Sequence, residues 1–153
     1  MRPSPSLSLL LSLPLLTLAS PALLPRQDTT PDYGYWDATV TTDAGRPGWQ
    51  TRQVSATYYN PGLAQPLSST CTWSFVPQGT NGPPVETSRC DREGFAYAWG
   101  APWYTLNLTQ TVVLDGGEEV TLYGGALLER RCGLGAGNAC SAQGRIEAGV
   151  TPL

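Results

Sequence analysis

Apolar and polar side chains alternate through the stretch from residue 103 to residue 131. At one parity, interrupted only by Gln110, lie Tyr104, Leu106, Leu108, Val112 and Leu114. At the other parity lie Thr105, Asn107, Thr109 and Thr111. Since successive side chains of a strand point to opposite faces, this pattern predicts a half-buried β-strand. The turn-forming sequence 115–117 and a second β-prone arm at 120–128 complete a long hairpin, which needs further strands to be stable.

The rest of the chain has shorter segments of the same kind, separated by turns rich in Gly and Pro. Further strands are predicted at 33–41, 51–59, from Cys71 onward, 85–90, 95–99 and 142–151. The pair Gly124-Gly125 is interpreted as a bulge or sharp bend. The sequence therefore predicts an all-β domain of about eight strands, built as a small antiparallel β-barrel or barrel-like sandwich.

The first 19 residues have the composition of a secretory signal peptide. An early Arg precedes an uncharged apolar run at 7–18, and small residues follow. Cleavage is expected after Ala19, since Thr17 and Ala19 fit the small-residue positions. The competing interpretation is a membrane anchor, which Pro14 and the interspersed Ser and Thr disfavour. We expect a secreted, extracellular protein.

Length and charge restrict the remaining possibilities. In 153 residues there is room for one domain, which we place at 33–153 after a flexible segment at 20–32. The chain has no Lys or His and a formal net charge of -3, so nucleic-acid and anionic-membrane partners are disfavoured. Without His it lacks the usual general base and the commonest metal ligand. We expect a protein that is not an enzyme and has no cofactor or metal.

All four cysteines lie in the predicted domain, and an even number in a secreted protein indicates disulfides. They are Cys71, Cys90, Cys132 and Cys140. Three pairings are possible. We favour the sequential one, because each pair then flanks a Gly-rich segment that must fold back on itself. A structural zinc site is the alternative, but the CxxC spacing and His are both missing.

Other motifs are less specific. Asn107-Leu108-Thr109 is an acceptor sequence for N-glycosylation, with its Asn on the polar parity of the predicted strand. The glycines at 133–137 are interpreted as part of a disulfide-bridged loop, because neither a lysine nor a strand-to-helix context suggests a phosphate site.

Two sets of residues are compatible with action on a sugar or binding of a ring, but each set has a simpler explanation. Paired glycosidase carboxylates are conceivable, but solvated charges are the favoured interpretation of Asp91, Glu93, Glu118 and Glu119. The five Trp and seven Tyr could stack on a sugar or a flavonoid-like ring, whereas filling of the core is favoured. Trp49 and Trp103 are expected to be the exposed ones.

Several segments together resemble a known family. Residues 35–41 (YWDATVT), residues 54–59 (VSATYY), the spaced Cys71 and Cys90, and a Gly-rich loop between Cys132 and Cys140 followed by one strand are similar to the Alternaria major-allergen family of secreted fungal proteins. The resemblance implies an antiparallel β-barrel with two sequential disulfides and no known enzymatic activity. Members are described as allergens, as elicitors of plant defence, and as binders of thaumatin-like defence proteins or flavonoid-type ligands.

The resemblance gives a ranking of functions. The first expectation is a fungal effector or elicitor, allergen-like, that binds a host plant protein. The alternative is a barrel that binds a small ligand, flavonoid-like or sugar, and the least favoured is a cell-wall glycoside hydrolase. Family members that form covalent dimers carry an extra cysteine ahead of the first strand, and residues 27–32 have none. We therefore expect a monomer or a non-covalent dimer, with no membrane attachment after cleavage.

Overall fold

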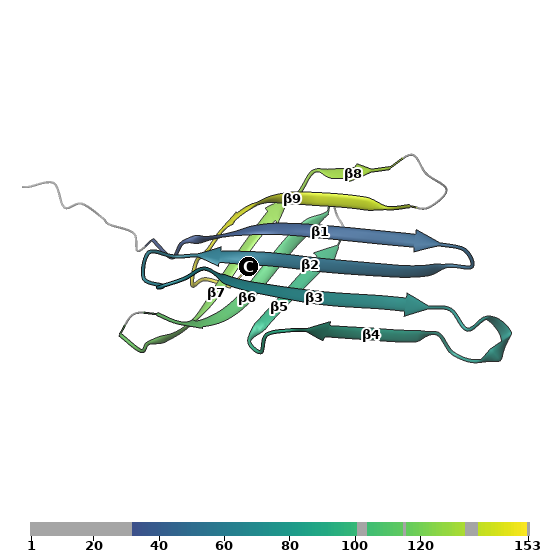
Figure 1. Cartoon of the computed structure of the whole chain (residues 1–153), viewed down its shortest axis with the longest axis horizontal. Coiled ribbons are helices and arrows are strands. Elements are labelled where there is room, and N and C mark those ends of the chain that lie inside the picture. The colour runs from purple at the N-terminus through teal and green to yellow at the C-terminus, as the bar shows by residue number, and fades with distance from the viewer. Residues whose placement is uncertain (1–31, 101–103, 115, 134–137, 153) are drawn as a thin grey trace, which may run out of the picture. The chain divides into compact units, whose positions relative to one another are not determined.

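Two antiparallel β-sheets make up the domain (Figure 1). The computed structural model describes residues 32–100, 104–114, 116–133 and 138–152. The larger sheet has the order β4-β3-β2-β1-β9-β8, and its strands are β1 (Tyr35–Gly45), β2 (Trp49–Tyr59), β3 (Leu67–Val76), β4 (Val85–Cys90), β8 (Arg130–Cys132) and β9 (Cys140–Glu147). The smaller sheet has the order β5-β6-β7, with β5 (Phe95–Gly100), β6 (Thr105–Val113) and β7 (Glu119–Leu127). A 3₁₀ turn, η1 (Gly79–Asn81), lies between β3 and β4.

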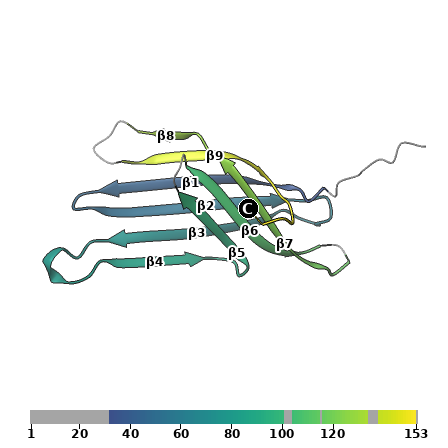
Figure 2. The ribbon, with the colours of Figure 1, turned by 180° about the vertical axis from the view of Figure 1, so that it is seen from behind.

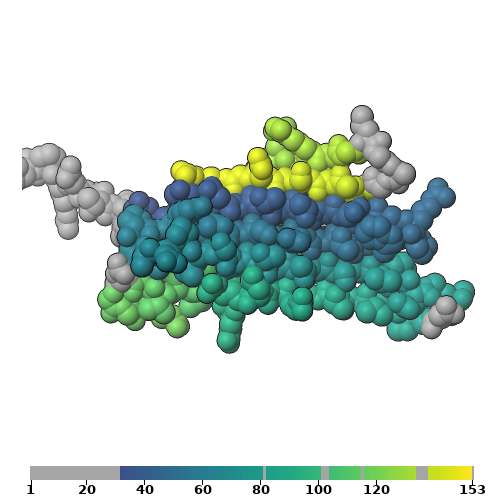
Figure 3. Space-filling view, viewed as in Figure 1, coloured from purple at the N-terminus to yellow at the C-terminus, as the bar shows by residue number. Residues whose placement is uncertain are grey.

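The smaller sheet crosses one face of the larger sheet obliquely (Figures 1 and 2). It leaves the far ends of β1 to β4 uncovered, and Figure 3 shows that the opposite face of the larger sheet is also uncovered. An isolated bridge between Tyr123 and Gly149 links β7 to the segment after β9. The all-β prediction is confirmed, and the predicted barrel or barrel-like sandwich is supported only in part, because the two sheets are not closed into a barrel.

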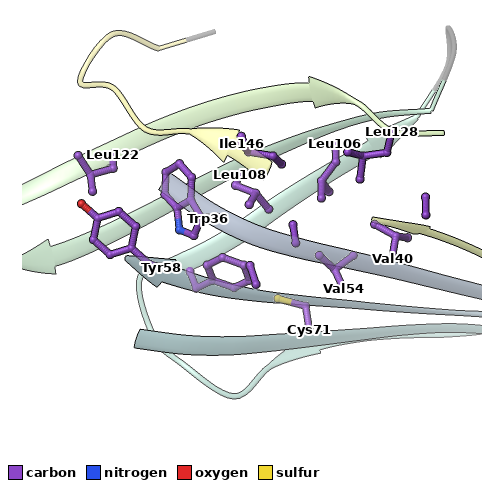
Figure 4. Close-up of a cluster of buried hydrophobic side chains, with 14 of the residues drawn as sticks. Trp36, Val40, Val54, Tyr58, Cys71, Leu106, Leu108, Leu122, Leu128 and Ile146 are labelled. Carbon is purple, nitrogen blue, oxygen red and sulfur yellow. The ribbon is translucent and has the colours of Figure 1, made fainter. Parts of the chain in front are cut away.

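The core lies between the sheets and is built from the inward-facing parity of both (Figure 4). Its largest fully buried side chains include Trp36, Val40, Val54, Tyr58, Leu106, Leu108, Leu122 and Ile146. Full burial of one such side chain contributes about 1.5–3 kcal/mol, so this one cluster supplies most of the favourable free energy of folding.

Gln110, which interrupts the apolar parity of β6, is a core residue and only 1% exposed. Its Oε1 accepts a hydrogen bond of 2.6 Å from Trp36 Nε1, and its Nε2 lies 3.5 Å from Ser69 Oγ. The apparent break in the pattern therefore satisfies a buried indole N–H, as buried polar groups require.

The bulge predicted at Gly124-Gly125 is wrong. The pairing of β6 with β7 continues without an extra residue, with Leu108 opposite Gly124 and Asn107 opposite Gly125. A Cβ on Gly124 would lie 2.4 Å from the carbonyl oxygen of Glu147 and 2.8 Å from Cζ3 of Trp36. Gly124 is thus required for the close approach of β7 to the larger sheet.

Strand boundaries differ from the predictions mainly where both faces are polar. The turn predicted at 43–48 is shorter, because β1 continues to Gly45 and pairs there with Trp49. In the loop predicted at 63–69, β3 already begins at Leu67, and the last strand runs from Cys140 to Glu147 instead of 142–151. With β8 added, the described part of the chain has nine strands.

Tyr104 was expected to be buried with Leu106 and is not. It precedes β6, has a φ of 59°, and is 43% exposed. Because this left-handed backbone conformation interrupts the strand, the alternation that holds from Leu106 onward does not extend back to Tyr104.

Candidate functional site

Both disulfides follow the sequential pairing. Cys71 and Cys90 are register partners on β3 and β4, and Cys132 and Cys140 are register partners on β8 and β9. The Cα atoms are 4.0 Å apart in each pair, and no cysteine is free. The predicted pairing is therefore confirmed, and all four thiols are used, which leaves no thiolate for the alternative zinc site.

Successive rows of inward-facing residues across the larger sheet differ sharply in polarity. One row consists of buried apolar side chains, Ala142, Val40, Val54 and Cys71. The next row, two residues along each strand, is Cys140, Thr42, Arg52 and Trp73. The apolar core therefore ends at the first row, and the second row forms the floor of a polar and aromatic cleft.

This end cleft has a volume of about 490 Å³. Its lining includes Thr42, Arg52 and Trp73 from the larger sheet, Trp99 at the end of β5, Tyr104 before β6, and Arg130 on β8. It occurs where the smaller sheet ends while β1, β2 and β3 continue.

Two arginine side chains, each stacked on an aromatic ring, preorganise the cleft. In the first, the guanidinium of Arg52 lies 4.9 Å from the ring centre of Trp73, and Trp73 stacks on Phe75 at 6.4 Å. In the second, the guanidinium of Arg130 lies 4.8 Å from the ring centre of Tyr104 and donates a 2.7 Å hydrogen bond to its hydroxyl. Trp99 packs on Tyr104 at 5.7 Å. Such cation–π contacts contribute about 0.5–2 kcal/mol each and fix the orientation of the rings.

The two arginines of the cleft have no carboxylate partner. Within the described ranges, the ion pairs are Arg131 with Glu129 and Arg145 with Asp37, and neither involves Arg52 or Arg130. The nearby Glu86 instead accepts a 2.6 Å hydrogen bond from Nε1 of Trp73. Moreover, the Nε of Arg52 and the Oγ1 of Thr42 are buried without a hydrogen-bond partner.

A second hollow, of about 640 Å³, lies along the larger sheet, and much of its lining is Ser and Thr. The hydroxyl groups on this outward parity bond one another across strands, as in Ser74 with Thr87 at 2.7 Å and Ser55 with Thr70 at 3.2 Å. Of these hydroxyl groups, those of Ser74 and Thr87 line the hollow and satisfy each other, and the hollow shares Thr42 and Arg52 with the end cleft.

The carboxylates considered for glycosidase chemistry are all exposed and lie on two separate turns. Asp91 and Glu93 lie between β4 and β5, and Glu118 and Glu119 lie at the start of β7. The carboxylate of Asp91 accepts a 2.8 Å hydrogen bond from the backbone N–H of Thr70, which is a structural role. None of the four lines the end cleft.

Asn107 lies on the outward face of β6, the central strand of the smaller sheet, and is partly exposed. Its neighbours across the sheet are Ala98 and Gly125, so no large side chain flanks the amide. The predicted loop at 133–137 falls mostly outside the described residues, as does Trp103.

Some of the aromatic residues lie in the core and others line the cleft. Trp36 and Tyr58 fill the core as favoured, whereas Trp73, Trp99 and Tyr104 gather at the cleft. Trp49, expected to be exposed, is half-buried and lies over Gly45. Sequence reasoning did not find Arg52 or Thr42. The available signal was that each continues the buried parity of its strand by one more position, Thr42 two residues after Val40 and Arg52 two residues before Val54.

Comparison of the chain with protein-family models, with curated proteins and with solved structures found no match. Among the described residues, no helix has the length and apolar character needed to cross a membrane. The same part of the chain holds no group of three or more His, Cys, Asp or Glu side chains arranged to bind a metal ion.

Proposed function

We propose that the protein is a secreted, non-enzymatic binding protein whose end cleft takes a small ligand containing a planar ring. The observation that carries this proposal is the gathering of Trp73, Trp99 and Tyr104 around one cleft of about 490 Å³. Ligand pockets are typically about 300–1,000 Å³ and are lined by aromatic side chains with a few polar groups. The signal-like residues 1–19 and the two disulfides support secretion.

The chemistry of the cleft supports binding over catalysis. Its inward-facing side chains, among the residues described, offer guanidinium, hydroxyl, amide and aromatic groups, and its cysteines are in a disulfide. General acid–base catalysis requires a group that exchanges a proton near the working pH, such as a carboxylate or an imidazole. The carboxylate in the lining, that of Asp43, is exposed and lies on the outward parity of β1. Glu86, in the adjacent inward-facing row, accepts a hydrogen bond from the indole of Trp73.

The test is calorimetric titration of the secreted, oxidised protein with a panel of flavonoids and simpler phenolic compounds. Trp99→Ala should weaken binding at least about tenfold, since stacking on an aromatic side chain contributes about 1–3 kcal/mol. The matched control is Trp49→Ala, because Trp49 lies at the β1–β2 turn outside the cleft. Equal losses in both variants, or no binding to the wild type, would contradict the proposal.

A second candidate function is binding of a host plant protein by an effector or elicitor. Two observations favour it: the resemblance to the allergen family, and the broad outward face of the larger sheet, which the smaller sheet leaves uncovered (Figure 3). An exposed edge strand, β4, adjoins that face. Exposed strand edges are sites at which other chains can add.

This second function is tested with a purified thaumatin-like plant protein and the mature chain, as a monomer or non-covalent dimer defined by size exclusion. Thr72→Arg places a bulky charge on the outward face of β3 and should weaken binding at least about tenfold. Ala96→Arg, at an exposed position on the outward face of the smaller sheet and outside the Asn107-Leu108-Thr109 acceptor sequence, is the control. No binding by the wild type and no defence response in leaves would exclude this role.

A further inference from the structure

We infer that the end cleft selects ligands in which a planar ring carries an oxyanion, and that Arg52 and Thr42 are the groups that receive the charge. This inference rests on the proposed function, because it concerns the same cleft. It names the chemical class of the ligand and the residues that distinguish a charged ligand from a neutral one.

The first argument is the position of the two side chains. Arg52 and Thr42 are register partners on β2 and β1, in the row next to the buried Val54 and Val40. At these inward-facing positions an apolar residue would extend the core by one row. The sequence instead places there a guanidinium and a hydroxyl, at the boundary where the core opens into the cleft.

The second argument is unsatisfied hydrogen-bonding capacity. The Nε of Arg52 and the Oγ1 of Thr42 are both buried, and neither has a hydrogen-bond partner. Leaving buried polar atoms without partners destabilises a fold, and native proteins rarely do so without a functional reason. Because both atoms are closed off from solvent, an oxyanion in the cleft would accept from them once the Arg52 and Thr42 side chains rotate toward it; the planar guanidinium and the hydroxyl would then match two oxygens of one acid group.

The third argument is charge. Arg52 and Arg130 both line the cleft, and neither is in an ion pair among the described residues, although the protein as a whole has a net charge of -3. Glu86, the acidic side chain in the adjacent row, is already engaged by Trp73. The described lining also contains one carboxylate, that of Asp43, which is exposed and on the outward parity of β1. With two arginines against this one carboxylate, the cleft is a cationic site on an acidic protein, and it favours an anion over a neutral molecule of the same shape.

The fourth argument joins charge to ring shape. The guanidinium of Arg52 already lies on Trp73, and that of Arg130 lies on Tyr104, so each charge is held over the face of an aromatic ring. A ligand whose acid group is attached directly to a ring can contact the Arg52 charge and the Trp99–Tyr104 pair together. A small inorganic anion would lack the second contact.

The experiment compares three probes that share one ring system: 2-naphthoate, 2-naphthalenesulfonate and the neutral 2-naphthamide. Affinities are measured by calorimetry at pH 7 on the secreted, oxidised protein. We expect at least one of the two anions to bind tenfold or more tightly than the amide, with an affinity that falls as salt is added. The carboxylate and the sulfonate distinguish the two kinds of acid group.

Variants of the protein separate the contribution of the ligand's charge to the affinity from that of its ring. Arg52→Gln should reduce affinity for the anion about tenfold while changing affinity for 2-naphthamide less than about twofold. Thr42→Val preserves the shape of the side chain and should also reduce anion affinity. Because it removes only a hydroxyl group, it tests the inference even if Arg52→Gln does not fold. Arg89→Gln, which removes a charge from the outward face of β4, is the control and should change neither affinity.

The outcomes distinguish this inference from the proposed function. Equal binding of all three probes, unaffected by Arg52→Gln and Thr42→Val, would overturn the inference and leave ring binding intact. Binding of none of the three would overturn both. A loss of anion affinity in Arg89→Gln equal to that in Arg52→Gln would also overturn the inference, because it would show an effect of overall charge.

Discussion

The indole nitrogen of Trp36 donates a 2.6 Å hydrogen bond to the side-chain oxygen of Gln110, and this bond joins the two sheets inside the core. Both residues are almost completely buried, on β1 and β6 respectively. Gln110→Leu keeps the volume but leaves the indole N–H without an acceptor. We expect a loss of about 1–3 kcal/mol in the free energy of unfolding, measured by urea denaturation.

The control for this change is Gln143→Leu, at an exposed position of β9, which should alter stability by less than about 0.5 kcal/mol. The double variant Gln110→Leu with Trp36→Phe removes donor and acceptor together. It should be more stable than the sum of the two single losses predicts, because no buried group is then unpaired. Simple additivity would contradict the proposed role of the bond.

Gly124→Ala should destabilise the protein by about 2–4 kcal/mol. The added methyl would lie 2.4 Å from the Glu147 carbonyl oxygen and 2.8 Å from the Trp36 ring, so β7 and β9 would have to move apart. The matched control is Gly100→Ala, since a Cβ on Gly100 meets no atom within 4 Å. The measurement compares the melting temperatures of Gly124→Ala and Gly100→Ala, and the first should be clearly lower. Similar values would show that Gly124 is not required for sheet packing.

The two disulfides should contribute unequally to stability. Cys71–Cys90 closes a separation of 19 residues, whereas Cys132–Cys140 closes a separation of 8; each has one buried cysteine and joins an edge strand to its neighbour. Chain entropy alone gives about 3.3 and about 2.6 kcal/mol. Replacement of each pair by Ala should therefore lower the urea midpoint more for 71/90. A larger loss for 132/140 would contradict this ranking.

Much of the fold followed from local pattern. Side-chain alternation located most of the strands, since one face of each strand contacts the core. It failed at the far ends of β1 and β2, where Thr42 and Arg52 replace apolar residues on the inward face and no period of two in hydrophobicity remains. The barrel expectation failed because strand patterns do not determine whether the edges of two sheets hydrogen-bond to each other.

The cleft was not predicted for a related reason. Its residues come from seven strands or their ends, and Trp73, Trp99 and Tyr104 look like core aromatics in sequence. Their exposure depends on where the smaller sheet stops, which is a tertiary property. Likewise, Gln110 looked like a defect in β6, because the partner that explains it, Trp36, is 74 residues away in the chain.

N-glycosylation is predicted at Asn107. The structure places this residue on the outward face of β6 between Ala98 and Gly125, which leaves space above the amide. Secretion from a eukaryotic host should give a mass heterogeneity that Asn107→Gln and Thr109→Ala both abolish and that peptide N-glycosidase removes. Gln53→Ala, on the larger sheet, is the control. An unmodified wild-type mass would show that the strand position is not accepted.

The last prediction concerns alkaline pH and Tyr58. This side chain is fully buried, donates a hydrogen bond to the backbone carbonyl of Tyr33, and accepts one of 3.0 Å from Nδ2 of Asn60. Burial raises the pKa of Tyr58 above its ordinary value, since the phenolate would be poorly solvated; the Asn60 hydrogen bond opposes this rise and the charge of Asp32 adds to it. The phenol therefore stays protonated in the fold at a pH at which the unfolded chain loses the proton.

Its contribution to stability is complete below about pH 10, the pKa of an unfolded tyrosine, and is lost as the pH rises from there through the higher folded pKa. The free energy of unfolding should thus fall as the pH rises above about 10. Tyr58→Phe should cost about 1 kcal/mol at pH 8 through its lost hydrogen bonds and should decline less steeply above pH 10. No free cysteine is present to start disulfide exchange under these conditions. Parallel declines in wild type and Tyr58→Phe would assign the alkaline loss to other groups.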